Sequence, residues 1–376
     1  MSNYVITANN ITELGGAQHV AHTLARGLVS RGHTVYLVGI TPVVDPHAYP
    51  SAGYTTLTLM PEVWPEKSST NGDLRANLRA HAVTELRSLL RSLGSANIVA
   101  TQLWSLEIAL DSIEKVDANF PVVGQYHGSF AAAASGRDIH RAQKLSGACE
   151  YFAVLSAEDA QAFAQAGLTN VVTLGNPTTI TPQQFTEAKA RVRGNTIDFI
   201  GRLSIEKGPD LLLDAWEMQR PAGFTLRLTG SGPMEAELKN RKLEGVEFCG
   251  PVADAAPVIA SSRVVVIPSR TEGAPLVLAE ALALGVPVVV TDVSSGIREM
   301  VAGIREMVAG NREMVAGNPR AVLVERDNAE TLARGIAAGL ALTPDPNPEL
   351  PQDDGIFDAL EGLFNFFMPG DRAATS

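Results

Sequence analysis

Two carboxylates, Glu272 and Glu280, stand with seven residues between them at the start of a predicted helix. Between them, the segment Gly273-Ala274-Pro275-Leu276 carries the chain from a loop into this helix, which ends at Gly285. Proline at the first helical position and glycine beyond the last are typical of helix ends. The free amides of such a helix start suit a phosphate, and carboxylates accept hydrogen bonds from vicinal sugar hydroxyls. Glu280 falls in the second turn, so it cannot repeat the contact of Glu272. A strand–helix corner with two surface acids is the plainer alternative.

Two cations follow another predicted strand. Arg202 and Lys207 lie directly after the apolar strand 196–200, in a loop that Gly201 opens. Arginine offers a bidentate fork and lysine a point charge, so together they can hold a diphosphate. The alternative is a solvated loop in which Glu206 balances the charge of Lys207.

Glycines and one histidine mark further strand ends. The pair Gly15-Gly16 follows the first predicted strand, and Gly232 lies in a Gly-Ser-Gly-Pro segment. Because glycine has no Cβ, such loops let the backbone approach a ligand closely. The second segment begins like a dinucleotide fingerprint, but Glu235 stands where the third glycine should be. His127 ends another strand, where its side chain can face a ligand. The alternative for the glycine pair is a simple turn, and the alternative for His127 is a structural role.

All these residues lie at the ends of short apolar segments that are typical of parallel strands. The first strand, helix and strand occupy about 35 residues, as in a βαβ unit whose two strands are parallel. Ligands of open α/β sheets bind beyond the carboxyl ends of such strands. The strands expected along the chain are 4–8, 34–38, 98–100, 122–126, 151–155, 196–200, 226–229, 264–267 and 288–290.

The alternation of strands and helices lapses once. Residues 177–195 are polar and contain two prolines, which is typical of an interdomain linker. We therefore expect two doubly wound, Rossmann-like α/β domains, at 1–176 and 196–342, that face a cleft. Residues 343–376 begin rich in Pro and Asp and then follow an apolar period of 3.6 residues. We expect a connector and an amphipathic helix that docks on the body of the protein, with membrane contact as the alternative.

A seven-residue unit, Gly-Ile-Arg-Glu-Met-Val-Ala, occupies 296–302 and recurs at 303–309 and, with Asn for Ile, at 310–316. Three heptads are too short for a coiled coil, and each internal glycine weakens a helix by about 1 kcal/mol relative to alanine. We interpret the segment as an in-frame expansion of one unit, or a sequence artefact, that loops outward, because surface insertions change entropy little. An interaction helix is the alternative.

Composition excludes several classes of protein. The 376 residues include 30 Lys and Arg against 41 Asp and Glu, so a nucleic-acid binder is not expected. Hydrophobic residues make up 45%, which excludes a disordered chain, and no apolar run or leader predicts a membrane span or export. Cys149 and Cys249 are too far apart for a disulfide scaffold and fit a reducing cytoplasm. His19 and His22 have no third metal ligand in view, so no metal is expected.

Taken together, these elements resemble glycosyltransferase family 4, retaining enzymes with two Rossmann-like domains in the GT-B architecture. The resemblance runs in the family's order over most of the chain, and the Glu-x7-Glu element within Pro-Ser-x-x-Glu-Gly is its most specific part. The carrying residues are Gly15-Gly16, His127-Gly128, Gly201-Arg202 with Glu206-Lys207-Gly208, Gly230-Ser231-Gly232-Pro233, and Glu272 with Glu280. The resemblance implies an N-terminal acceptor domain and a C-terminal domain for a nucleotide-sugar donor.

The resemblance also implies roles in the C-terminal half. Arg202 and Lys207 look like the pair that neutralises the donor diphosphate as it leaves. Glu280 looks like the acceptor of ribose hydroxyl bonds. Glu272 and the amides of 273–276 look like contacts to the donor sugar and phosphate. Cations at the leaving diphosphate act on charge that develops in the transition state.

In the N-terminal half, the resemblance implies that Gly16 approaches the diphosphate and that His127 lies near the transferred sugar. The heptad expansion falls where the family has a single Gly-x-x-Glu segment near the donor. Glu299, Glu306 and Glu313 are therefore equal candidates for that position. The resemblance implies neither a metal nor a nicotinamide cofactor.

We therefore expect retaining transfer of a hexose-type sugar from a nucleoside diphosphate, with UDP the first choice of donor and GDP the next. The acceptor hydroxyl belongs to a small molecule, glycan, lipid or polymer. A nucleotide-sugar epimerase or hydrolase on the same scaffold, and an inactive nucleotide-sugar-binding subunit, stay open as alternatives. A nicotinamide-dependent oxidoreductase is disfavoured because neither half has a complete Gly-x-Gly-x-x-Gly.

Four arginines, Arg75, Arg79, Arg87 and Arg91, lie on one flank of the predicted helix 73–93. The plain interpretation is a solvated flank. The alternative is contact with an anionic lipid or polymer acceptor, which would place a cytoplasmic protein at the inner face of the membrane.

Overall fold

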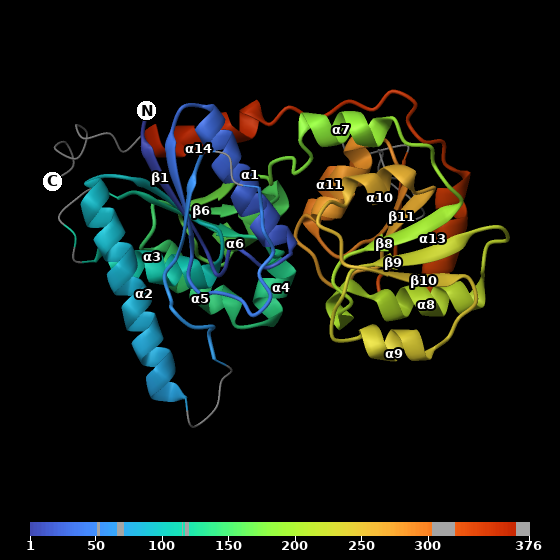
Figure 1. The fold of residues 1–376 in the computed structure, drawn as a ribbon, viewed down its shortest axis with the longest axis horizontal. Coiled ribbons are helices and arrows are strands. Elements are labelled where there is room, and N and C mark those ends of the chain that lie inside the picture. Colours follow the sequence, from blue (N-terminus) through green and yellow to red (C-terminus); the bar gives the residue numbers. More distant parts are fainter. Residues whose placement is uncertain (51–52, 66–70, 115, 117–119, 303–319, 366–376) are drawn as a thin grey trace. The chain divides into compact units, whose positions relative to one another are not determined.

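The structure is a computed structural model, and it describes residues 1–50, 53–65, 71–114, 116, 120–302 and 320–365. It divides the chain into two compact units (Figure 1). Unit 1 comprises Met1–Pro177 together with the segment from Asp353, and unit 2 comprises Thr178–Gln352.

Unit 1 has a seven-stranded sheet in the order β3-β2-β1-β4-β5-β6-β7, with parallel pairing throughout. Its strands are β1 (Asn3–Ala8), β2 (Thr34–Gly39), β3 (Thr55–Thr58), β4 (Asn97–Ala100), β5 (Val122–Tyr126), β6 (Tyr151–Val154) and β7 (Val171–Thr173). Its helices are α1 (Gly16–Ser30), α2 (Gly72–Leu93), α3 (Leu103–Ile113), α4 (Phe130–Ser135), α5 (Asp138–Ser146), α6 (Ala157–Gln165) and α14 (Asp354–Asn365).

Unit 2 has a six-stranded sheet in the order β10-β9-β8-β11-β12-β13, again parallel. Its strands are β8 (Thr196–Ile200), β9 (Thr225–Thr229), β10 (Val246–Gly250), β11 (Val264–Ile267), β12 (Val288–Thr291) and β13 (Ala321–Val324). Its helices are α7 (Pro182–Lys189), α8 (Pro209–Met218), α9 (Glu235–Asn240), α10 (Ala256–Ser261), α11 (Leu276–Ala283), α12 (Ser295–Ala302) and α13 (Ala329–Ala341), and a 3-10 turn, η1, spans Ile205–Lys207.

Both faces of the second sheet are buried, because successive residues of a strand point to opposite sides. In β11, Val264 and Val266 belong to one hydrophobic core, whereas Val265 and Ile267 belong to the other. A strand buried on both faces is a continuous apolar run in the sequence. This explains why the central strands were predictable, and the doubly wound fold that the sequence predicts is confirmed.

The nine strands expected from the sequence are all present, each with its ends within one residue of the predicted ones. The four strands that the sequence analysis did not predict are β3, β7, β10 and β13, which are the edge strands of the two sheets. An edge strand pairs on one side only, and β3 and β10 are exposed or half-exposed, although β13 is a buried apolar run like the central strands. All four residues of β3 are exposed, for example, and β10 alternates half-buried with exposed residues.

The segment expected to be a linker, 177–195, contains helix α7. Thr181 caps this helix, with Gln184 in a capping box and Pro182 in the first turn. Phe185 and Ala188 pack on the core of unit 2. The polar residues that suggested a linker are therefore helix caps and an exposed helix face, and the boundary between the units lies at Pro177.

The amphipathic C-terminal helix docks on unit 1, as predicted. Phe357, Leu360 and Phe364 of α14 are buried, and Figure 1 shows α14 beside α1. The ring of Phe357 lies where a side chain at Gly27 would be, 1.9 Å from an ideal Cβ. Arg31 forms ion pairs with Asp358 and Glu361 of α14.

The first heptad unit forms most of α12. The second and third units, and with them Glu306 and Glu313, lie outside the described residues. Glu299 is the member of the three candidate glutamates that the structure places, within α12.

Candidate functional site

The predicted site residues of unit 2 lie where its strand order reverses. The chain moves from β8 outward to β10 on one side and then returns to β11 on the other side of β8. Arg202 and Lys207 follow β8, and Glu272 follows β11. Because β8 and β11 are neighbours, their loops meet at the carboxyl edge of the sheet, where open α/β sheets bind ligands.

Lys207 and Glu272 form an ion pair between these two loops. The Lys207 Nζ lies 2.7 Å from Glu272 Oε1, which also accepts a hydrogen bond from Ser269 Oγ at 2.7 Å. The Glu272 side chain is 10% exposed and that of Lys207 is 34% exposed. The carboxylate therefore fixes a partly accessible ammonium group at the reversal point, and Arg202 lies exposed in the same loop.

The loop after β8 takes its shape from a left-handed glycine. Gly208 has φ +67°, a conformation that side chains disfavour, and it precedes α8. A Cβ at this position would lie 2.1 Å from the carbonyl oxygen of Pro268. Gly208 thus lets the β8 loop lie directly against the end of β11.

Arg270 connects the same two loops through its backbone and its side chain. Its amide donates to the carbonyl of Glu206 at 2.8 Å, and its Nη1 donates to the carbonyl of Ile205 at 2.7 Å. The guanidinium forms a bidentate pair with Asp210 at 2.8 and 2.7 Å, and Nε donates to Asp327. Arg270 therefore holds the turn that carries Lys207 against the loop that carries Glu272.

The glycines after β8 and β9 allow the backbones of the two loops to touch. An ideal Cβ at Gly230 would lie 1.9 Å from the Gly201 carbonyl oxygen, and one at Gly232 would lie 2.4 Å from that of Leu203. The Leu203 amide donates to the carbonyl of Ser231 at 2.9 Å. Contacts within the protein thus explain these glycines, and direct ligand contact at Gly201 and Gly232 stays a prediction.

Helix α11 begins at Leu276, one residue later than predicted, because Pro275 is extended with ψ 131° and serves as the N-cap. The first amides of a helix have no partner within it. Just before this helix start, the carbonyl of Gly273 accepts a hydrogen bond from Ser294 Oγ at 2.6 Å. The loop through Gly273 and Ala274 is thereby anchored to the segment after β12.

Glu280 lies in the second turn of α11 and has partners different from those of Glu272. Its carboxylate accepts a hydrogen bond from Thr179 Oγ1. Burial, reinforced by the charge of Asp254, raises the pKa of Glu280 to about 7. The group is thus a carboxyl that changes charge near neutral pH.

In unit 1, Gly15 and Gly16 join the loop after β1 to α1, and Gly15 is the N-cap. The Gly15 amide donates to Tyr49 Oη at 3.4 Å, and Tyr49 Oη donates to the carbonyl of Glu13 at 2.9 Å. This loop also lies at a reversal of strand order, between β1 and β4.

His127 follows β5 at the same edge of the unit 1 sheet. Burial lowers its pKa to about 4, although a hydrogen bond with Asn176 opposes the shift. Its Nε2 is buried and has no hydrogen-bond partner among the described residues. The imidazole is therefore neutral at physiological pH and keeps one ring nitrogen for a further partner.

The two halves of the chain match two protein families. Residues 14–178 match the family described as Glycosyltransferase Family 4, and residues 194–341 match Glycosyl transferases group 1. The chain belongs to glycosyltransferase family 4.

Two relatives of this family 4 chain are similar to part of its sequence. An uncharacterised glycosyltransferase of Haemophilus influenzae is 29% identical over 174 residues, which is 44% of each chain. The amylovoran biosynthesis glycosyltransferase AmsD of Erwinia amylovora is 31% identical over 168 residues, 41% of this chain and 47% of that protein. The matches thus span less than half the length of either relative.

A solved structure shows the same fold. HepE of Anabaena, in a complex with UDP and glucose, superposes with a TM-score of 0.63 and 19% identity, covering 91% of this chain and 90% of HepE. The family 4 chain therefore has the two-unit fold of the GT-B class.

The sequence patterns do not predict some residues at the carboxyl edge of unit 2. They are Thr179, Asp210, Ser269, Arg270 and Asp327. Asp210 and Arg270 stand 60 residues apart, and Thr179 and Glu280 stand 101 apart, so no local pattern indicates these pairs. The sequence signal for Ser269 and Arg270 is their position three and two residues before Glu272, within the most specific motif.

Three arginines of α2 in this family 4 chain have partners within unit 1. Arg75 lies over the Trp64 ring at 4.6 Å, and Arg79 pairs with Asp111 at 2.5 Å. Arg87 donates to the carbonyls of Asp111 and Ser112. These contacts pack the flank against its neighbours, and binding of an anionic lipid or polymer by this flank stays a prediction.

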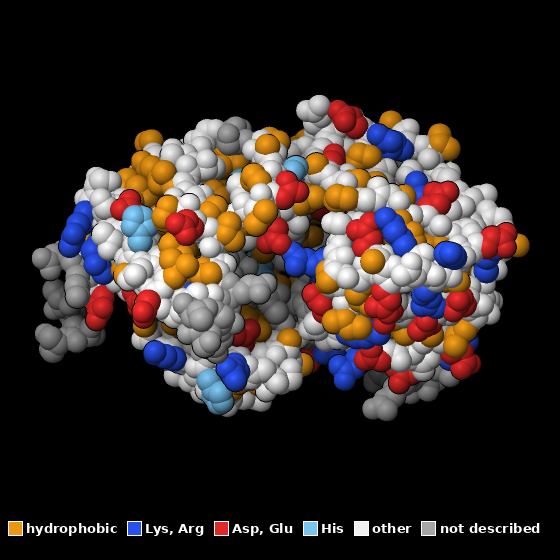
Figure 2. All heavy atoms as spheres, turned by 60° about the horizontal axis from the view of Figure 1, so that its bottom comes forward, with side chains coloured by type: hydrophobic (Ala, Val, Ile, Leu, Met, Phe, Trp, Pro, Cys, Tyr) orange, Lys and Arg blue, Asp and Glu red, His pale blue; other side chains and the backbone are white. Residues whose placement is uncertain are grey.

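His22 is one of the two histidines whose spacing could suit a metal. Both ring nitrogens of His22 are hydrogen-bonded, to Tyr54 Oη at 2.7 Å and the Ile11 carbonyl at 2.8 Å, so this histidine is structural. Among the described residues, no helix is both long and apolar enough to cross a bilayer. In Figure 2, acidic and basic side chains are interspersed over the visible face of unit 2.

Proposed function

We propose that this chain transfers a hexose-type sugar from a nucleoside diphosphate, with UDP as the first choice, to an acceptor hydroxyl with retention of configuration. The observation that carries the proposal is the Lys207–Glu272 ion pair between the β8 and β11 loops, with Arg202 in the first of them. Family membership supports sugar transfer, and the structures of HepE with UDP and with UDP-glucose support the choice of nucleotide.

The chemistry needs cations at the leaving group. When the bond between the anomeric carbon and the diphosphate breaks, the electron pair leaves with the diphosphate and positive charge develops on the sugar. Lys207 and Arg202 stabilise the negative charge as it forms, which lowers the barrier more than it tightens binding of the donor. The acceptor oxygen then bonds to the anomeric carbon, and its proton passes to the departing diphosphate.

The carboxylates of Glu272 and Glu280 have different roles. Glu272 orients Lys207 and accepts a hydrogen bond from the donor sugar, and Glu280 accepts hydrogen bonds from the ribose hydroxyls. Glu280 is half ionised near pH 7, so ribose binding is stronger above that pH. The ligand roles of the amides of 273–276, and those of Gly16 and His127, remain predictions from the family resemblance.

Slow donor hydrolysis tests this function without a known acceptor. The full chain is incubated with UDP-glucose, UDP-galactose or GDP-mannose, and release of the nucleoside diphosphate is measured. We expect release from one donor, a loss of at least tenfold in Lys207→Met, and no change in Lys239→Met. Lys239 is a matched lysine of unit 2 that pairs with Glu235 on α9.

NMR of the first sugar released tests retention of configuration. The anomer of the donor is expected if configuration is retained, whereas the opposite anomer would contradict retention. A new nucleotide sugar without diphosphate release would indicate an epimerase and overturn the proposal, as would failure to bind or cleave any donor.

A further inference from the structure

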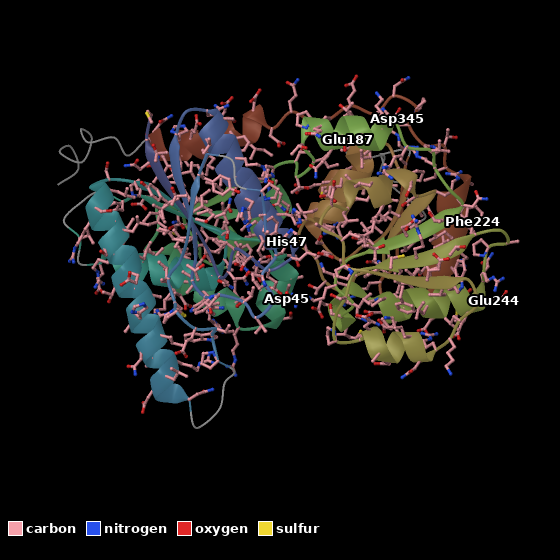
Figure 3. The ribbon with its side chains drawn as sticks, viewed as in Figure 1. Asp45, His47, Glu187, Phe224, Glu244 and Asp345 are labelled. Atoms are coloured by element: carbon pink, nitrogen blue, oxygen red, sulfur yellow. The ribbon has the colours of Figure 1, made fainter. Side chains whose placement is uncertain are left out.

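Unit 2 has a second cluster of cations, away from the residues described above. A cavity of about 140 Å³ is lined by Lys189, Arg191, Arg193 and Asp345, with apolar residues between them. Arg193 lies shortly before β8, and Leu284, which also lines the cavity, lies shortly before β12. The cavity therefore lies at the amino ends of the strands, on the edge of the sheet opposite to Lys207. Asp345 lies in the segment that runs past α7 (Figure 3).

Arg193, which lines this cavity, and Arg263, whose charge acts on Arg193, each have a buried donor without a partner among the described residues. The Arg193 Nη2 donates to the Leu284 carbonyl at 3.0 Å, and the Arg263 Nη2 donates to the Leu342 carbonyl at 2.9 Å. The Arg193 Nε and the Arg263 Nη1 are both inaccessible to solvent and lack a hydrogen-bond partner among the described residues. Buried polar groups of native proteins are nearly always paired, so these donors point to a missing acceptor.

The charges around the cavity also favour an anion. Burial and the nearby charge of Arg263 lower the pKa of Arg193, although the charge of Asp345 opposes the shift. Asp345 is the acid that lines the cavity, but its carboxylate is engaged by Arg320 and by the amide of Asn347. Cations thus exceed available acids here, although the whole chain has a net charge of −11.

We propose that this cavity binds a phosphate-bearing anion at a site separate from that for the sugar donor. Its 140 Å³ equals the liquid volume of about five waters, whereas pockets for whole organic ligands occupy roughly 300–1,000 Å³. A phosphate group fits this volume and a nucleotide does not. Guanidinium groups match phosphate oxygens in geometry, and the cavity is lined by two of them, the half-buried Arg193 and the exposed Arg191, together with the exposed Lys189.

Calorimetry with the full chain tests this site. Inorganic phosphate and glucose 6-phosphate are titrated separately at constant ionic strength in chloride. We expect binding to the wild type and at least tenfold weaker binding to Arg193→Met. Arg193→Lys keeps the charge without the guanidinium fork, so it is expected to bind less tightly than the wild type. The matched control is Arg241→Met, because the Arg241 guanidinium is already paired with Asp214 and Glu217.

Lys207→Met separates this site from the proposed donor site. We expect it to retain phosphate binding at the cavity while losing nucleotide binding, and Arg193→Met to do the reverse. Tighter binding of glucose 6-phosphate would identify a phosphorylated metabolite as the ligand, and equal binding would identify the phosphate group alone. Absence of binding, equal binding to the wild type and both Arg193 variants, or loss only in Lys207→Met would overturn the proposal.

Discussion

Glu272 receives two hydrogen bonds of 2.7 Å, from Lys207 Nζ and Ser269 Oγ, and so joins a cation to the loop after β11. Glu280, eight residues further on, interacts instead with Thr179. The environments of the two carboxyl groups therefore differ. Burial raises the pKa of Glu280 to about 7, so its charge changes near neutral pH.

Glu280→Gln should change the pH dependence of stability. The pKa of Glu280 is about 7 in the folded chain and 4.5 ordinarily, so between these values the folded state binds more protons than the unfolded state. Stability due to this group is therefore complete below about pH 4.5 and lost as the pH rises through 7. We expect the variant to be roughly 2 kcal/mol more stable than the wild type at pH 8, with little of that difference at pH 5.

Urea unfolding at several pH values measures this difference. Glu299→Gln is the matched control, since Glu299 lies in α12 of the same unit and is exposed rather than buried. A difference for Glu280→Gln that is the same at pH 5 and pH 8 would contradict the raised pKa.

At the scale of elements, the β8 and β11 loops depend on Arg270, which contacts both. Arg270→Met removes the bidentate pair with Asp210 and the bond to the Ile205 carbonyl. We expect a loss of about 1–3 kcal/mol in stability, because Asp210 keeps its charge without that partner. We also expect weaker nucleotide binding, because Lys207 loses its fixed position.

Arg220→Met is the control for Arg270→Met. Arg220 pairs with Glu244, whose side chain is 85% exposed, so its removal should leave nucleotide binding unchanged. Arg270→Lys should recover part of the affinity. Nucleotide affinity in Arg270→Met equal to that of the wild type would show that Arg270 does not position Lys207.

Gly208 provides a second test of these loops. Gly208→Ala places a Cβ 2.1 Å from the Pro268 carbonyl oxygen at φ +67°, which combines backbone strain with a collision. Gly223 has φ +79° and nothing within 4 Å of an ideal Cβ. We expect Gly223→Ala to lose roughly 1–2 kcal/mol from strain alone and Gly208→Ala to lose clearly more. Equal losses on chemical unfolding would contradict the close approach of the two loops.

The sequence predicts some elements well and others poorly, for physical reasons. Central strands such as β11 are buried on both faces and are therefore continuous apolar runs, whereas β3 at the sheet edge is exposed throughout. Lys207 and Glu272 were predicted from their motifs, but their pairing across 65 residues depends on the adjacency of β8 and β11. The sequence predicts a linker at Thr179, because polar residues before a capped helix have the composition of a loop.

At the scale of the whole molecule, the last described helix belongs to the first unit. Phe357→Ala in α14 should destabilise unit 1 by roughly 3–5 kcal/mol, because a buried ring that packs on Gly27 is lost. Thermal unfolding followed by calorimetry should show this loss in the transition of unit 1, with that of unit 2 unchanged. Leu74→Ala is the control, since Leu74 is 42% exposed. A shift confined to unit 2 would contradict the assignment of α14.

The central claim is that unit 2 of this family 4 chain holds the diphosphate of a nucleotide sugar at Lys207. The most direct test is thermal stabilisation of the full chain by UDP, GDP, ADP, CMP and NAD, compared with Lys207→Met. A ligand at 100 times its dissociation constant adds about 2.7 kcal/mol, which is readily detected. We predict stabilisation by one nucleoside diphosphate that is lost in Lys207→Met. Stabilisation by NAD alone, or by a diphosphate equally in both proteins, would contradict the account.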